Sequence, residues 1–73
     1  MSRKKEFVHW MEVEEEDGRT ARYSIYRKDG STYIRNGKGY EHLMHPAATS
    51  LDDEIRLVFK AKVLRYIMPW EKP

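Results

Sequence analysis

The chain has 73 residues and no cysteine, which excludes both disulfide bonds and thiolate ligands to a metal ion. It also lacks any apolar run approaching the roughly 20 residues that a membrane-spanning helix needs. The basic start at residues 1–5 is followed by Glu6 and not by the apolar segment of a signal peptide. We therefore expect one cytoplasmic domain, residues 1–73, without a membrane partner.

A strong net charge and a catalytic signature are missing as well. The formal charge is only +2, which favours no class of partner. The acidic residues 14–17 lie in a predicted turn, without the pocket that acid–base catalysis by carboxylates requires. The segment around Lys38 lacks the G-x-x-x-x-G-K-[ST] pattern of a phosphate-binding loop. His42 and His45 have metal-like spacing but no third ligand at a predictable distance. We predict that the protein is not an enzyme and binds neither a cofactor nor a metal ion.

What the chain does contain is an alternation of apolar and polar residues through residues 6–44, which predicts antiparallel strands. The alternation of apolar and polar residues in the first two strands determines how many residues the loop between them must have. A three-residue loop at residues 16–18, with Gly18 in the left-handed conformation, keeps Val13 opposite Ala21 and the apolar side chains on one face.

The second hairpin signal is the Asp-Gly pair at residues 29–30, where a two-residue turn places Ile25 opposite Ile34. Residues 36–39 form a third turn, and residues 40–44 are a candidate fourth strand. The inward face of this meander then consists of Phe7, Met11, Val13, Ala21, Tyr23, Ile25 and Ile34.

Residues 50–68 predict one helix that covers this inward face. Ser50 is a suitable N-cap, acidic residues follow it in the first turn, and Pro69 ends the segment. The predicted fold is therefore α+β, an antiparallel β-meander of three or four strands with one C-terminal α-helix packed on one face. The helix face turned to the sheet consists of Leu51, Ile55, Val58, Phe59, Val63 and Tyr66.

The opposite side of the predicted helix carries a second apolar stripe, made of Leu57, Ala61, Leu64 and Met68. A small domain with one helix cannot easily cover both sides. The stripe is either scattered apolar surface, or surface covered by the chain ends, or a docking or dimerisation surface. We expect a monomer, with a homodimer through this stripe as the alternative.

The outward face of the meander collects further candidate partner-binding residues, namely Trp10, Arg22, Tyr26, Tyr33 and Arg35. They could be cross-strand pairs that stabilise the sheet, a platform that docks a protein, or a surface that stacks the bases of single-stranded nucleic acid. The chain ends add candidates in a mobile basic arm at residues 1–5 and a tail at residues 69–73: Arg3, Lys4, Lys5 and Trp70.

The layout of the whole chain resembles the small RNA polymerase-binding regulators of lytic bacteriophages, in particular those of Xanthomonas phages. The resemblance rests on chain length and on a meander, RYSIYRKDGSTYIRNGKGY, followed by SLDDEIRLVFKAKVLRYIM. It implies that the protein binds the N-terminal region of the largest subunit of bacterial RNA polymerase in the host cytoplasm, inhibits promoter initiation and promotes antitermination. It assigns no site residue. The alternative function is a small single-stranded nucleic-acid-binding module.

Overall fold

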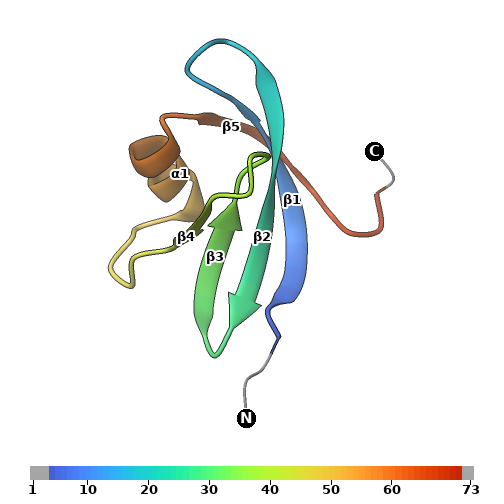
Figure 1. Cartoon of the computed structure of the whole chain (residues 1–73), viewed down its shortest axis with the longest axis vertical. Helices are drawn as coiled ribbons and strands as arrows, with labels where there is room; N and C mark the ends of the chain where they lie inside the picture. Colours follow the sequence, from blue (N-terminus) through green and yellow to red (C-terminus); the bar gives the residue numbers. More distant parts are fainter. Residues whose placement is uncertain (1–3, 72–73) are drawn as a thin grey trace.

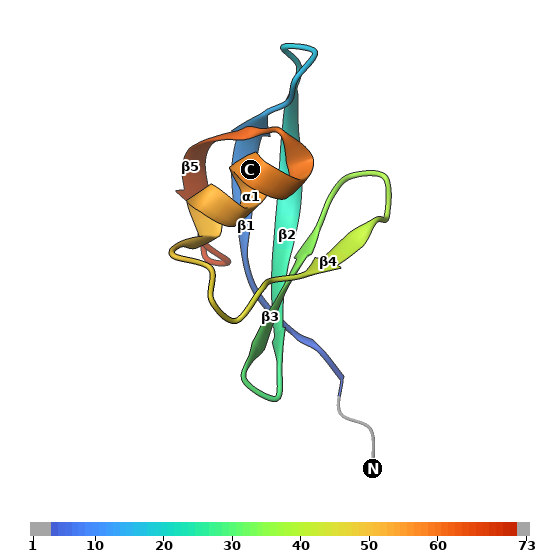
Figure 2. The same ribbon diagram turned by 90° about the vertical axis from the view of Figure 1, so that its left-hand side faces the viewer.

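A computed structural model describes residues 4–71, which form five strands and one helix. The strands form one antiparallel sheet in the order β4-β3-β2-β1-β5, and the helix lies on one side of it (Figures 1 and 2). The predicted α+β meander with one packed helix is thus confirmed. The elements are β1 (Glu6–Glu14), β2 (Thr20–Lys28), β3 (Ser31–Arg35), β4 (Glu41–Leu43), α1 (Leu51–Phe59) and β5 (Lys62–Ile67).

The hairpin between β1 and β2 has the predicted loop and register. The N–H of Glu15 donates to the carbonyl of Arg19 at 2.8 Å, which leaves three residues in the loop. Gly18 has a φ of 86°, in the left-handed region where glycine is free of steric cost. Val13 lies opposite Ala21, so the apolar side chains of the two strands share one face.

The hairpin between β2 and β3 is also as predicted. Asp29 and Gly30 have φ values of 51° and 81°, as a two-residue turn with both central residues left-handed requires. Ile25 lies opposite Ile34 across this hairpin. The candidate fourth strand forms as β4, with His42 opposite Ile34 on β3.

A bulge in β1 overturns the predicted position of Phe7. Phe7 lies opposite Tyr26 and His9 lies opposite Ile25, so Val8 is an extra residue in the ladder. The extra residue reverses the alternation at this point. Phe7 therefore shares the outward face with Tyr26 and does not belong to the core.

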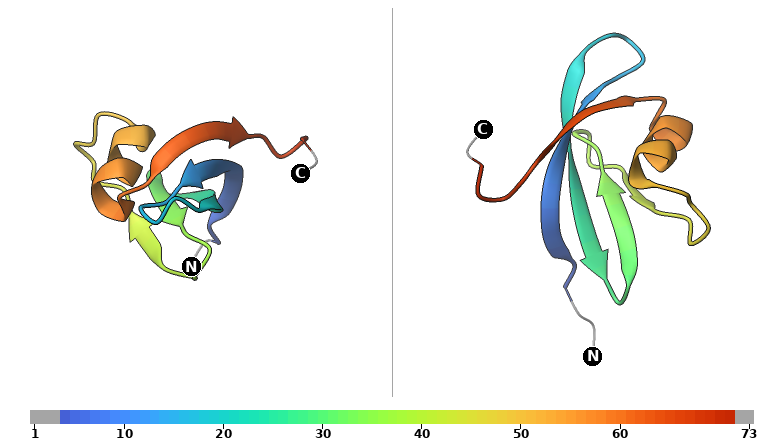
Figure 3. Two further views of the ribbon diagram at one scale, coloured as in Figure 1. Left: turned by 90° about the horizontal axis from the view of Figure 1, so that it is seen from above. Right: turned by 180° about the vertical axis from the view of Figure 1, so that it is seen from behind.

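Residues 50–68 do not form one helix, and that prediction is wrong in its second half. The helix begins after Ser50, as predicted, but it ends at Phe59. Lys60 then adopts the left-handed conformation, with φ 57° and ψ 37°, and its N–H bonds to the carbonyl of Arg56. The chain reverses there and continues as β5, which pairs with β1 (Figure 3).

Two physical effects favour a strand after this reversal. Without β5, the strand β1 would leave one row of its backbone N–H and C=O groups unpaired at a sheet edge. The segment also contains Val63, Tyr66 and Ile67, which are β-branched or aromatic residues that suit a pleated surface. As a result Ala61 and Ile67, predicted for a helix, are buried.

The core lies between the inward face of the sheet and α1. Its buried members are Met11, Val13, Tyr23, Ile25, Ile34, Ile55 and Ala61. The hydroxyl of Tyr23 donates to Glu15 at 2.8 Å, and burial together with this bond raises the pKa of the tyrosine. The hydroxyl of Tyr66 donates to Asp52 at 2.7 Å, which ties β5 to the first turn of α1.

Lys5, which the sequence assigns to a mobile basic arm, contacts the sheet. Its Nζ lies 2.7 Å from Oε1 of Glu41 and 4.6 Å from the ring centroid of Tyr33, so it packs against β3 and β4. Lys4 is exposed, and Arg3 lies outside the described residues. In the tail, Trp70 is 76% exposed and follows a strand that leads away from the helix (Figure 3).

Candidate protein-docking surface

The outward face of the sheet carries three aromatic rings that contact one another. The Phe7 and Trp10 ring centroids lie 4.7 Å apart, and those of Phe7 and Tyr26 lie 5.7 Å apart in an edge-to-face arrangement. The bulge at Val8 makes this cluster, because it turns Phe7 outward beside the two predicted rings. The three rings form one partly exposed apolar patch across β1 and β2.

Cations cover the faces of the rings. The guanidinium of Arg35 lies 4.6 Å from the centroid of Tyr26, and that of Arg22 lies 5.8 Å from the centroid of Trp10. These distances are typical of cation–π contacts. Arg35 also donates to the Tyr26 hydroxyl at 3.5 Å. The aromatic and basic residues predicted for this face therefore form one connected surface.

A single carboxylate neutralises one side of this surface. Glu41 on β4 accepts a hydrogen bond from Lys5 at 2.7 Å and from Arg35 at 3.0 Å. The hydrogen bond from Lys5, together with the weaker effect of Arg35, holds the pKa of the Glu41 carboxyl below its usual value. Glu41 thus keeps both cations in place over Tyr33 and Tyr26 and cancels part of their charge.

The other side of the surface contains a second ion pair and, among the described residues, one cation without an acidic partner. Arg65 on β5 lies 3.3 Å from Glu12 on β1. Arg22 is opposite Glu12 on β2, but within residues 4–71 it takes part in no ion pair. Arginine and tryptophan are both enriched among the residues that contribute most of the binding energy at protein interfaces.

The predicted apolar stripe does not exist as a surface. Leu57 lies on α1, Leu64 is an extra residue at a bulge in β5, and Met68 follows that strand. Leu57 and Leu64 are exposed, Met68 is half-buried, and Ala61 belongs to the core. Helical spacing no longer relates these residues, so the continuous stripe does not form, and Leu57 and Leu64 are scattered exposed apolar residues, one of the three alternatives considered.

The two histidines with metal-like spacing, His42 and His45, form hydrogen bonds with the helix on the inward side of the sheet. Nε2 of His42 lies 2.7 Å from Oε2 of Glu54, which also accepts from the backbone N–H of His45 at 3.0 Å. Within residues 4–71 no group of three or more histidine, cysteine or acidic side chains is arranged to hold a metal ion.

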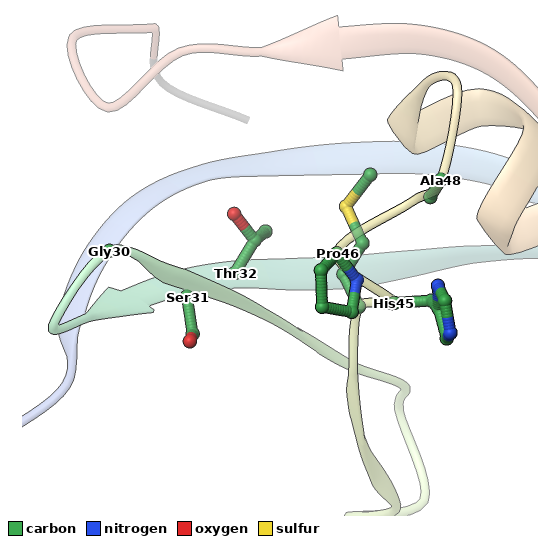
Figure 4. Close-up of a pocket in the computed structure, with 7 residues that line it drawn as sticks. Gly30, Ser31, Thr32, His45, Pro46 and Ala48 are labelled. Carbon is green, nitrogen blue, oxygen red and sulfur yellow. The ribbon is translucent and has the colours of Figure 1, made fainter.

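A shallow cavity of about 210 Å³ lies between β3 and the loop that follows β4 (Figure 4). Its walls are short or apolar side chains of the β2–β3 turn, β3 and the loop after β4, including Thr32 and Pro46, with His45 at one end (Figure 4). No carboxylate or lysine lines it, so it offers little for chemistry.

Sequence reasoning missed three members of the outward surface: Phe7, Glu41 and Arg65. Glu41 could have been found, because the register of a fourth strand places it opposite Arg35. Phe7 and Arg65 could not, because each depends on a bulge or on a strand that the sequence pattern does not indicate.

Comparisons of the chain with protein-family models, with curated proteins and with solved structures found no match. In the part of the chain that the structure describes, no helix is long and apolar enough to cross a membrane.

Proposed function

We propose that the protein is a small regulator that acts by binding another protein through the outward face of its sheet. The observation that supports this most is the connected cluster of Phe7, Trp10 and Tyr26 beside the unpaired guanidinium of Arg22. Tryptophan, tyrosine and arginine are the residues that most often dominate protein interfaces. Because the sheet holds them in place, binding requires little ordering of side chains.

The same surface suits a protein better than single-stranded nucleic acid. Nucleic-acid affinity comes largely from cations that neutralise phosphates, but Lys5, Arg35 and Arg65 already have carboxylate partners. Base stacking needs an open ring face, but Tyr26 is covered by a guanidinium and contacted by the ring of Phe7. The single-stranded nucleic-acid binder remains the alternative that the test below must exclude.

The proposed target is bacterial RNA polymerase, at the N-terminal region of its largest subunit, as the resemblance in chain layout implies. In this proposal the protein acts in the cytoplasm of a phage-infected cell as a monomer without catalytic activity. It inhibits promoter initiation and promotes antitermination.

The test is direct binding of the purified protein to nuclease-treated bacterial RNA polymerase, followed by transcription from a template with a promoter and a terminator. We expect a complex, fewer initiated transcripts and more read-through. Arg22→Ala, on an exposed side chain that does not support the core, should weaken binding about 30-fold, equivalent to ~2 kcal/mol.

Lys38→Ala is the matched control, because Lys38 is an exposed cation in the turn after β3 and lies outside the aromatic cluster. It should bind polymerase as the original chain does. Failure of the original chain to bind polymerase refutes the target. Retention on single-stranded oligonucleotides that falls steeply with salt, and that Arg22→Ala abolishes, favours the alternative function instead.

A further inference from the structure

The outer edge of β5 is open. In the sheet order β4-β3-β2-β1-β5, the strand β5 has β1 on one side and no strand of residues 4–71 on the other. It is six residues long, whereas β4 at the opposite edge has three. Viewed from above, β5 follows the rim of the molecule with α1 near its start (Figure 3). Part of its backbone N–H and C=O groups therefore point away from the sheet, as at any edge strand.

This edge is basic, and two of its cations have no acidic partner. Lys60 precedes the strand and Lys62 begins it, and within the described residues neither forms an ion pair. Lys62 lies opposite Glu14 on β1, but within the described residues the two form no ion pair. By contrast, Arg56 and Arg65 near the same edge are paired with Asp53 and Glu12. The unpaired positive charge is therefore concentrated where β5 starts.

An apolar side chain of the same strand is also exposed. Leu64 is 44% exposed at the bulge in β5, two residues after Lys62. Open backbone groups, an exposed leucine and unpaired cations thus occur together on one strand. An extended peptide that adds a strand uses these three features: main-chain hydrogen bonds for affinity, and side-chain contacts for selectivity.

A second copy of this chain is a poor occupant of the edge. Antiparallel pairing of two β5 strands would place two sets of Lys62 and Arg65 along one short ladder, where the four like charges repel one another. The bulge at Leu64 also interrupts regular pairing with an identical edge. Charge complementarity instead favours an occupant that carries carboxylates.

We propose that the edge of β5 binds an extended acidic segment of another protein, which adds to the sheet as a further strand. Carboxylates of that segment meet Lys60 and Lys62, and its apolar side chains contact Leu64. This site goes beyond the proposed function, because it lies at an edge of the sheet and uses none of the aromatic rings of the outward face.

The probe is a soluble seven-residue peptide in which glutamate alternates with valine or threonine, titrated into the isotopically labelled protein. We expect the backbone amide signals of β5 to shift and their exchange with solvent to slow. Two control peptides separate the contributions. One replaces every glutamate by lysine, and the other keeps the glutamates but carries N-methyl groups on alternate amides. Both should bind at least tenfold more weakly, since they lose charge complementarity and strand hydrogen bonds respectively.

The matching protein variant is Lys60→Glu combined with Lys62→Glu, two exposed positions at which a change of charge leaves the core intact. It should weaken binding of the acidic peptide at least tenfold. Arg27→Glu should not, because Arg27 is exposed and lies opposite Glu6, at the other end of β1 from the residue that faces Lys62. Arg22→Ala, on β2 and not next to β5, should also leave peptide binding unchanged, although it weakens docking through the outward face. This separates failure of the edge from failure of the proposed function.

Three results would overturn the proposal. The first is no binding of the acidic peptide, and the second is equal binding of its N-methylated form. The third is a dimer in sedimentation experiments whose amide protection covers β5, because the occupant of the edge would then be a second copy of the chain.

Discussion

Glu54 on α1 accepts a 2.7 Å hydrogen bond from Nε2 of His42 on β4 and is only 7% exposed. A carboxylate can only accept hydrogen bonds, so Nε2 of His42 must carry the proton in this contact. The same oxygen accepts from the backbone N–H of His45, which lies in the loop between the two elements. One side chain of the helix therefore holds both the last strand of the meander and the loop that leads to the helix.

The first prediction concerns acid stability. The hydrogen bond from His42, and after it the one from the His45 backbone, holds the pKa of the Glu54 carboxyl below its ordinary value. A carboxyl whose pKa is lower in the folded state stabilises the fold above its unfolded pKa, and this effect is lost as the pH falls through the folded pKa. Glu54→Gln should therefore lower the thermal midpoint by several degrees at pH 7, and the difference from the original chain should shrink towards pH 3.

Glu16→Gln is the matched control for this experiment, because Glu16 is exposed in the β1–β2 loop. It should leave the thermal midpoint unchanged at both pH values. A difference between Glu54→Gln and the original chain that is equally large at pH 7 and pH 3 would contradict the assigned role of the ionised carboxylate.

The second prediction compares two neighbouring positions on α1. Ile55 is 0% exposed in the core, so Ile55→Ala should lower the free energy of unfolding by about 2–5 kcal/mol. Leu57 is exposed on the same helix, and Leu57→Ala should change it by no more than about 0.5 kcal/mol. Urea denaturation measures both. A large cost at Leu57 would mean that this side chain is covered in solution, for example in a dimer.

The meander could be predicted from the sequence because its signals are local. The Asp-Gly turn at residues 29–30 and the parity of Val13 and Ala21 each involve residues close together in the chain, and both registers are confirmed. The position of Phe7 failed for a different reason. The bulge at Val8 follows from how β1 bends against its neighbours, and alternation alone cannot show which residue is extra.

The strand β5 could not be predicted, because its pairing with β1 joins residues about fifty positions apart, such as Glu12 and Arg65. The segment has apolar residues at helical spacing and an N-cap at Ser50, so local propensity favours a helix throughout. Pairing with the open edge of β1 outweighs that propensity after Phe59. The same long-range pairing limited the prediction of the outward surface. Sequence reasoning found candidate residues on β1, β2 and β3, but not the continuation of the surface onto β5.

The third prediction tests the β2–β3 turn. Gly30 has a φ of 81° and Gly37 has no positive φ, while an added Cβ would meet no atom within 4 Å at either site. Gly30→Ala should therefore cost about 1 kcal/mol of stability through backbone strain alone. Gly37→Ala should be neutral or stabilise by about 0.4–1 kcal/mol, because alanine restricts the unfolded chain. Equal effects at the two positions would contradict the predicted turn geometry.

The last prediction tests where the helix ends. Lys60 has left-handed backbone angles, which cost a non-glycine residue about 1 kcal/mol, so Lys60→Gly should raise the free energy of unfolding by up to about 1 kcal/mol. If residues 50–68 formed one continuous helix, the same change would lower it by about 1 kcal/mol, since glycine disfavours a helix interior. Leu57→Gly is the control, because Leu57 lies inside α1, and it should lower the free energy of unfolding by about 1 kcal/mol. Opposite signs for the two glycine variants in urea denaturation indicate a chain that reverses at Lys60, whereas two losses of equal size indicate an unbroken helix.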